Sequence, residues 1–324
     1  MKAVVLFSLG LDSILATKVV KDLGVKLEAI HFVSEFFPLT RKKKELLSFF
    51  KEKLGISLMI KDVSQEFIKI VKSPRYGYGK NLNPCIDCKI LMFKKAKEFM
   101  KKIDAQFIVS GEVLNERPFS QREEIFKLIE EEVGLEKQIL RPLSAKLLTP
   151  TIAEEKGWVD RGRLFGFKGK SRQPQIELAK SLGIYFYPQP AGGCLLTDPA
   201  FSKRLRDLME YEPDFDLKDV KLLKIGRHFR LSSSAKLIVL RKKDEKDILK
   251  DLSLKEFVQF ILNKETVSLG IGEFKEKDLE LAVQIILSYL GTKMREIKII
   301  DGDKEKKIIT FPLPKEKLPL YRIN

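Results

Sequence analysis

The segment SLGLDS near the start of the chain restricts the fold more than any other feature. An apolar strand over residues 2–8 ends at Ser8, and the chain then passes through Gly10 and enters a helix at Asp12 and Ser13. Such a turn directs backbone N–H groups and the positive end of a helix toward one point, which favours anion binding. The lysine of a Walker phosphate loop is missing, so a kinase or GTPase is disfavoured. An ordinary helix start capped by Asp12 is the alternative interpretation.

The chain after this turn alternates between apolar runs and helical patterns. Further strands are predicted over residues 27–33, 57–63 and 106–110, with a lysine-rich helix over 41–54. Strands that alternate with helices are typical of α/β folds, in which helices cover both faces of a parallel sheet. The sequence therefore predicts an open, Rossmann-like parallel sheet.

Length and composition predict two domains and a polyanionic partner. The 324 residues are 44% hydrophobic, which is enough for two cores. No apolar run approaches the roughly 20 residues of a membrane span, and the first run lacks the cleavage site of a signal peptide, so we expect a cytoplasmic protein without a membrane partner. The net charge of +16 favours nucleic acid as a partner. A highly charged, heat-adapted surface is the alternative.

An acidic, proline-bearing stretch divides the chain. MEYEPDFDLKDV is interpreted as a linker over residues 209–220. The larger domain is expected over residues 1–208, and it carries most of the positive excess. A smaller α+β domain is expected over residues 221–324, where a strand, a helix and a hairpin turning at Asp301 and Gly302 follow one another.

The three cysteines are a second chemical signal. Cys85 and Cys88 lie in NPCIDC at a predicted helix start, where the local potential stabilises a thiolate, and Cys194 lies in PAGGCLLTDP. An odd number of cysteines without an export signal favours metal or redox chemistry over a disulfide framework. The open alternatives are a zinc site, which needs a fourth ligand, a redox pair of Cys88 with Cys194, and unrelated buried cysteines.

Together the turn and the cysteines resemble a known family. SLGLDS is similar to the PP-loop of ATP pyrophosphatases, Ser-Gly-Gly-x-Asp-Ser, with Leu9 at the position of the first glycine. A PP-loop, an NPCxxC motif and a late Gly-Gly-Cys, in this order, resemble the tRNA thiolation branch of that family, which includes 2-thiouridylases and 4-thiouridine synthetases. GEVLNERPFSQR and FKGKSRQPQ resemble segments of the same branch, so the likeness covers most of residues 1–205.

The resemblance implies a nucleotide site. In that family the turn holds the β and γ phosphates while ATP is split to AMP and pyrophosphate, and the aspartate helps to hold magnesium. A side chain at Leu9 must then point away from the phosphates and accept the backbone angles of the turn. The ends of the second and fourth strands border the ligand, and His31 is interpreted as a core histidine without a catalytic role. The nucleotide-binding set is Ser8, Leu9, Gly10, Asp12, Ser13, Phe32 and Gly111.

The resemblance also implies a role for the cysteines. Family members with all three carry a four-iron four-sulfur cluster on three thiolates, and its open iron takes the sulfide that is donated to RNA. Cys85, Cys88 and Cys194 are therefore predicted as metal ligands and, with Asp12, as catalytic residues. The alternative within the class is a cluster-free enzyme in which Cys194 carries a persulfide and Cys88 resolves it. Outside the class, the alternatives are a non-thiolating PP-loop ligase or amidotransferase and an RNA-binding protein with a decayed turn.

The implied activity is ATP-dependent thiolation of a tRNA uridine at C2 or C4. ATP adenylates the carbonyl oxygen, pyrophosphate leaves, and sulfur then displaces AMP. The sulfur donor is expected to be inorganic sulfide or a persulfide from a cysteine desulfurase, and a homo-dimer is left open.

RNA contacts are predicted in two places. A basic segment with interleaved phenylalanines is suited to phosphates and bases, although a solvated charged surface is the alternative. GRHFRL, at residues 226–231, resembles the small RNA-associated domain of ribosome quality-control proteins. The basic segment consists of Arg161, Arg163, Lys168, Lys170 and Arg172.

Overall fold

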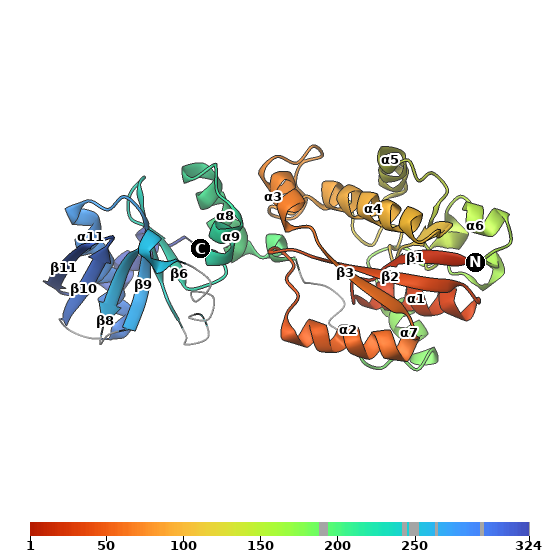
Figure 1. Ribbon diagram of the computed structural model, residues 1–324, viewed down its shortest axis with the longest axis horizontal. Coiled ribbons are helices and arrows are strands. Elements are labelled where there is room, and N and C mark those ends of the chain that lie inside the picture. The colour runs from red at the N-terminus through yellow and green to blue at the C-terminus, as the bar shows by residue number, and fades with distance from the viewer. Residues whose placement is uncertain (188–193, 242–244, 246–252, 263–264, 292–294, 324) are drawn as a thin grey trace. The chain divides into compact units, whose positions relative to one another are not determined.

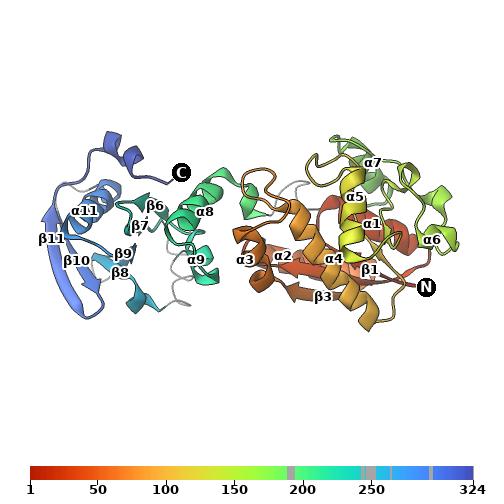
Figure 2. The same ribbon diagram turned by 90° about the horizontal axis from the view of Figure 1, so that it is seen from above.

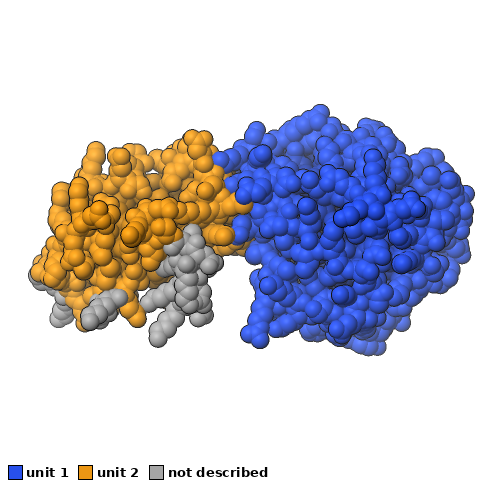
Figure 3. All heavy atoms as spheres, viewed as in Figure 1, with its two compact units in different colours: residues 1–194 blue, residues 195–324 orange. Residues whose placement is uncertain are grey.

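A computed structural model describes the chain except for residues 188–193, 242–244, 246–252, 263–264, 292–294 and 324 (Figure 1). The chain divides into two compact units, residues 1–194 and residues 195–324 (Figure 3). Helices α8 (Pro199–Tyr211) and α9 (Leu217–Leu222) take up most of the segment interpreted as a linker, and they belong to the second unit. The domain limits drawn from the sequence stay a prediction.

The first unit is built on a five-stranded sheet in the order β3-β2-β1-β4-β5. All four neighbouring pairs are parallel, which confirms the predicted open parallel sheet. The central strand is buried on both faces, since Ala3, Val4 and Val5 are fully inaccessible, and this explains its unbroken apolar sequence. The strands are β1 (Lys2–Leu6), β2 (Lys26–Val33), β3 (Ser57–Asp62), β4 (Phe107–Val109) and β5 (Ile139–Leu140).

Helices cover both faces of this sheet. Helices α3, α4 and α5 lie on one face, and α1, α2 and α7 lie on the other (Figures 1 and 2). The predicted helix over 41–54 is confirmed as α2, because Thr40 caps its first turn and Gly55 ends it at φ 54°. The helices are α1 (Leu11–Asp22), α2 (Arg41–Leu54), α3 (Ser64–Lys72), α4 (Cys85–Lys102), α5 (Glu123–Val133), α6 (Ile152–Glu155) and α7 (Gln173–Ser181), with 3₁₀ helices η1 (Ala145–Leu147) and η2 (Arg161–Arg163).

The second unit contains a six-stranded antiparallel sheet in the order β11-β10-β8-β9-β7-β6. Helix α11 packs its apolar face on this sheet, with Val283, Ile286 and Leu287 in the core. The predicted hairpin is confirmed, since Asp301 pairs with Lys304 across a turn that holds Gly302 at φ 59°. The remaining elements are β6 (Arg227–Arg230), β7 (Ala235–Val239), β8 (Val258–Leu262), β9 (Glu265–Gly272), α11 (Glu276–Leu290), β10 (Arg295–Asp301), β11 (Lys304–Thr310), η3 (Leu195–Thr197), η4 (Leu254–Glu256) and η5 (Lys315–Leu320). The separate small α+β domain is thereby confirmed.

Within the described part of the chain, no helix has the length and apolarity needed to cross a membrane.

Candidate active site

The turn between β1 and α1 is held by short-range hydrogen bonds. The Ser13 hydroxyl donates to the Gly10 carbonyl at 2.9 Å, the Gly10 N–H donates to the Ser8 hydroxyl at 3.3 Å, and the two serine hydroxyls lie 3.2 Å apart. Gly10 is the N-cap of α1 and makes no side-chain capping bond to the N–H groups of the first turn, which argues against a simple cap by Asp12. The N-terminus of a 12-residue helix therefore faces the turn without a capping side chain.

Leu9 adopts the conformation that a glycine would favour. Its φ is 65°, in the left-handed region, while its side chain is only 2% exposed and belongs to the core of the first unit. The side chain thus points away from the turn, as the sequence analysis required. Left-handed backbone at a non-glycine residue costs on the order of 1 kcal/mol, and burial of the leucine side chain offsets this cost.

The end of β4 touches the turn directly. A Cβ atom at Gly111 would lie 2.6 Å from the Ser13 nitrogen and 2.7 Å from the Asp12 carbonyl carbon, distances that backbone atoms do not tolerate. Only glycine fits at this close approach. Gly111 and the turn residues therefore lie together at the carboxyl edge of the sheet, where the strand order changes direction between β1 and β4.

Asp12 lies in a buried polar cluster with residues far along the chain. Arg172 contacts Asp12 at 3.4 Å and Glu116 at 2.5 Å, and Gln175 donates to Glu116 at 3.1 Å. Burial raises the pKa of Asp12 to about 6, Glu116 adds to the rise, and Arg172 opposes it. The Oδ1 atom of Asp12 is buried without a hydrogen-bond partner among the described residues. An inaccessible carboxylate oxygen of this kind suits a cation bound beside the turn.

The end of β2 supplies a buried histidine and a buried phenylalanine. His31 Nδ1 lies 2.7 Å from the Phe7 carbonyl oxygen, and burial lowers the pKa of His31, so the neutral ring donates this bond. This geometry fits the interpretation of His31 as a core histidine. Phe32 is 8% exposed at the same strand end. Its contact with a nucleotide stays a prediction.

Two of the cysteines open helix α4, as predicted. Cys85 is its first residue after Pro84, and the Cys88 N–H donates to the Pro84 carbonyl at 2.9 Å. Between them, the Asp87 carboxylate accepts hydrogen bonds from the backbone N–H groups of Arg75 and Tyr76 at 3.0 and 3.1 Å. These bonds fix the loop that leads into the helix. Asp87 faces that loop, while the two cysteines are half-buried.

Cys194 lies near Cys88 at the end of the first unit. Burial raises the pKa of the Cys88 thiol well above its usual range, and the nearby Cys194 and Cys85 raise it further. Burial also lowers the pKa of Lys43, and Cys194 opposes that change, so this lysine of α2 belongs to the same neighbourhood. The two glycines before Cys194 lie outside the described residues.

The three cysteine thiols have the chemistry of ligands that bind a metal ion or cluster as thiolates. Buried thiols beside one another lose their protons only when a cation compensates the negative charge, which is what iron or zinc supplies. Among the residues that the structure describes, no three His, Cys, Asp or Glu side chains are gathered as metal ligands. Cluster ligation by Cys85, Cys88 and Cys194 therefore stays a prediction.

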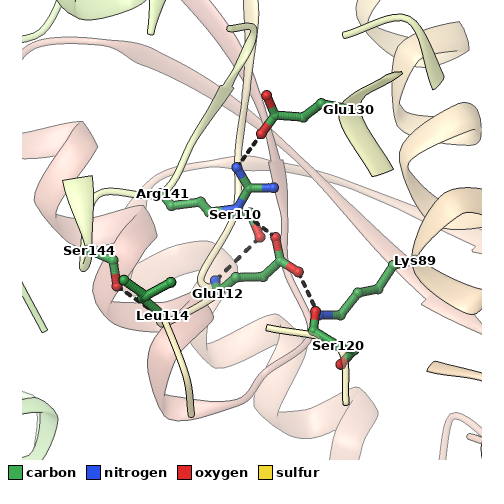
Figure 4. Close-up of polar contacts among 8 residues, drawn as sticks. All are labelled: Lys89, Ser110, Glu112, Leu114, Ser120, Glu130, Arg141 and Ser144. Atoms are coloured by element: carbon green, nitrogen blue, oxygen red, sulfur yellow. Dashed lines mark hydrogen bonds and ion pairs between the residues drawn. The ribbon is translucent and has the colours of Figure 1, made fainter. Parts of the chain in front are cut away.

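A buried ion-pair network joins the sheet edge to the cysteine helix (Figure 4). Glu112 lies 2.6 Å from Lys89 and 2.9 Å from Arg141, and Arg141 also contacts Glu130 at 2.5 Å. Lys89 donates to the Ser120 carbonyl at 2.7 Å as well. The GEVLNERPFSQR segment resembles the family as a whole, but no local sequence pattern marks Glu112, Glu116 or Lys89 as site residues.

The basic segment is dispersed rather than gathered on one open surface. Arg172 faces Asp12 and Glu116, and Arg161 forms an ion pair with Glu154 at 2.5 Å. Arg163, Lys168 and Lys170 are exposed. The interleaved Phe165 and Phe167 pack against the core of the first unit. RNA binding by this segment stays a prediction, and Arg172 is better placed for a ligand of the turn.

Comparison with protein families identifies both parts of the chain. Residues 1–147 match the family described as thiamine biosynthesis protein (ThiI), and residues 226–322 match the NFACT protein RNA binding domain. A region similar to the ThiI family thus lies in the first unit, and a region similar to the NFACT RNA-binding domain lies in the second. No curated protein sequence matches the chain.

Three solved structures were found to be similar to part of the chain. A 4-thiouridine synthetase in complex with RNA and ATP is 21% identical, with a TM-score of 0.41 over 69% of this chain and 52% of that chain. The U34-tRNA thiolase NcsA from Methanococcus maripaludis, with its 4Fe-4S cluster, is 15% identical, with a TM-score of 0.36 over 69% and 71%. A predicted subunit of tRNA methyltransferase from Methanocaldococcus jannaschii is 15% identical, with a TM-score of 0.36 over 68% and 92%. The present chain thus spans about half of the 4-thiouridine synthetase.

Proposed function

We propose that this protein is an ATP-dependent tRNA uridine thiolase. The observation that carries the proposal is that one unit contains both sets of residues. The turn at the sheet edge has a buried Asp12 oxygen with no hydrogen-bond partner among the described residues, Cys85 and Cys88 open α4, and Cys194 lies close enough to Cys88 to raise its pKa. The match of residues 1–147 to the ThiI family supports this combination, and the NFACT RNA-binding domain supports an RNA substrate.

The phosphate half-site activates the uridine. Backbone N–H groups at the start of α1, with the Ser8 and Ser13 hydroxyls, bind the β and γ phosphates of ATP. Asp12 would hold magnesium through its buried oxygen, and Arg172, 3.4 Å from Asp12, would neutralise phosphate charge. The uridine carbonyl oxygen attacks the α-phosphorus, pyrophosphate leaves, and the base becomes an adenylate. The carbonyl oxygen then departs with AMP when sulfur attacks the same carbon.

The cysteine half-site presents the sulfur. Cys85, Cys88 and Cys194 would hold a four-iron four-sulfur cluster, which supplies a bound sulfide as the nucleophile. The chain itself contributes three thiols and a half-buried surrounding that limits the access of water. The uridine must be unpaired to reach both half-sites, and the basic residues and the second unit would hold the tRNA.

A cluster-free route is the second candidate, because Cys88 and Cys194 lie near each other and no described metal-ligand group is formed. In this route Cys194 receives the outer sulfur of a cysteine desulfurase persulfide, and that sulfur attacks the uridine carbon as AMP leaves. The Cys88 thiolate then attacks the Cys194 sulfur, which breaks the S–S bond to the base, releases thiouridine and leaves a Cys88–Cys194 disulfide that an external thiol reduces.

One experiment separates these candidates. The protein is purified without oxygen, and tRNA nucleosides are analysed by mass after incubation with ATP, magnesium and sulfide. The proposal expects brown protein with bound iron and thiouridine formation that is lost when the iron is removed. A parallel incubation replaces sulfide with cysteine and a cysteine desulfurase, which supply sulfur at the persulfide level. Thiouridine formed by colourless, iron-free protein in that incubation and not with sulfide alone would establish the persulfide route, and no thiouridine under any condition would refute the function.

A further inference from the structure

Two consecutive residues shortly after β4, Gly111 and Glu112, contact the phosphate turn and the cysteine helix. Gly111 packs against the backbone of Asp12 and Ser13 in the phosphate turn. The next side chain, Glu112, lies 2.6 Å from Lys89 of helix α4 (Figure 4). Consecutive residues therefore connect the nucleotide turn to the helix that carries Cys85 and Cys88.

Two contacts hold the side chain of Lys89 in place. Its ammonium group pairs with Glu112 and donates to the Ser120 carbonyl at 2.7 Å, and its side chain is 18% exposed. Lys89 follows Cys88 directly and lies one helical turn after Cys85. Since a helix is stiff over one turn, an anchor at Lys89 sets the position of both cysteines.

Glu112 stays ionised although its side chain is buried. Burial raises the pKa of Glu112, but Lys89 and Arg141 outweigh this effect, so the carboxylate stays ionised. Buried ion pairs add little net stability compared with apolar packing of the same volume. The network is therefore better explained by the geometry that it fixes than by stability.

We propose that Glu112 is a positioning residue that holds the cysteine end of α4 at a set place relative to the nucleotide turn, through its ion pair with Lys89. This inference extends the proposed thiolase function. The effect of Glu112 on the position of Cys85 and Cys88 can be tested without tRNA or ATP. Glu130 provides a matched control, because it binds the same Arg141 and has no ion pair with Lys89.

The test measures how fast each cysteine reacts with iodoacetamide in the full-length, iron-free protein, by mass analysis of the peptides. In Glu112→Gln and in Lys89→Arg, the rates at Cys85 and Cys88 are expected to change by about fivefold or more, with a change below about twofold at Cys194. Lys89 lowers the pKa of both thiols directly, and Lys89→Arg keeps this positive charge while it replaces the ammonium group that contacts Glu112 and Ser120. Glu130→Gln is expected to change no rate by more than about twofold. Lys89→Arg carries the test if Glu112→Gln fails to fold, as judged by Trp158 fluorescence.

Two results would overturn the inference. One is an unchanged rate at Cys85 and Cys88 in both variants, and the other is an equal change at all three cysteines, which indicates general loosening. In the thiolation assay, Glu112→Gln should lower kcat by about tenfold with the KM for ATP within about twofold of the wild-type value. If the wild-type protein does not thiolate tRNA, the proposed function fails, and the alkylation rates still decide whether Glu112 positions the cysteines.

Discussion

The two halves of the candidate site are held together in different ways. The phosphate turn is closed by hydrogen bonds among residues 8–13 and by the contact with Gly111. The cysteine half brings Cys194 to a helix that begins at Cys85, and that helix is anchored through the Lys89–Glu112 ion pair. One half is thus mainly backbone and local, and the other depends on side chains from distant parts of the chain.

This difference decides how each half responds to change. A backbone turn tolerates little displacement, because its N–H groups must converge on one anion. A cysteine site held by a helix and an ion pair shifts when a charge is removed, without loss of the turn. We therefore expect that substitutions can disable either half separately.

The largest effect is expected for Gly111→Ala. Its Cβ would meet backbone atoms of the turn at 2.6 to 2.7 Å, so the turn must move and detectable binding of MgATP should be lost. Isothermal titration calorimetry measures this binding. Gly166→Ala is the matched control, since its Cβ would meet its nearest atom at an ordinary 3.5 Å. Wild-type affinity in Gly111→Ala would show that the turn and the β4 edge do not form one nucleotide site.

The next effect concerns pH and Asp12. The pKa of Asp12 is about 6 in the folded protein and 3.8 in an unfolded reference, so the folded state keeps a proton that the unfolded state has lost between these values. The free energy of unfolding should therefore fall as the pH rises from 4 to 6, by about 2 kcal/mol more in the wild type than in Asp12→Asn. Urea unfolding followed by Trp158 fluorescence reports on the first unit, since Trp158 is the only tryptophan and stacks on Phe107. If the free energy of unfolding changes equally with pH in the two proteins, the pKa of Asp12 is not raised by burial.

A smaller effect is expected for Leu9→Gly. Glycine relieves the left-handed backbone at φ 65° but removes a side chain that is 2% exposed, so we expect a net loss of about 2 kcal/mol in the free energy of unfolding. The affinity for MgATP should be kept, because the leucine side chain points away from the turn. Urea unfolding and calorimetry check both statements. A variant more stable than the wild type would mean that backbone strain outweighs burial.

Elements that are held by local contacts could be predicted from the sequence, and contacts between distant side chains could not. The turn, the parallel sheet and the helix over 41–54 follow from local patterns of apolar residues, caps and glycines, and the structure agrees with them. Strand β5 has only two residues, too few for any periodicity to reveal it. Local patterns therefore accounted for most of the first unit.

Long-range polar partners could not be predicted in this way. The basic neighbours of Arg172 predict an RNA contact, and no local pattern indicates its contact with Asp12, 160 positions earlier in the chain. Lys89 and Glu112 are ordinary charged residues in sequence, and only the fold brings them 2.6 Å apart. The same holds for the approach of Cys194 to Cys88, which the family resemblance suggested and local patterns did not.

The most direct test of the account measures both half-reactions in one mixture. Anaerobic protein is incubated with ATP, magnesium, sulfide and tRNA, and pyrophosphate and thiouridine are quantified together. The account predicts equal amounts of both products for the wild type, pyrophosphate without thiouridine for Cys88→Ser, and neither product for Gly111→Ala. Thiouridine formed at the wild-type rate by either variant would contradict the central claim that one turn and one cysteine centre act together on a tRNA uridine.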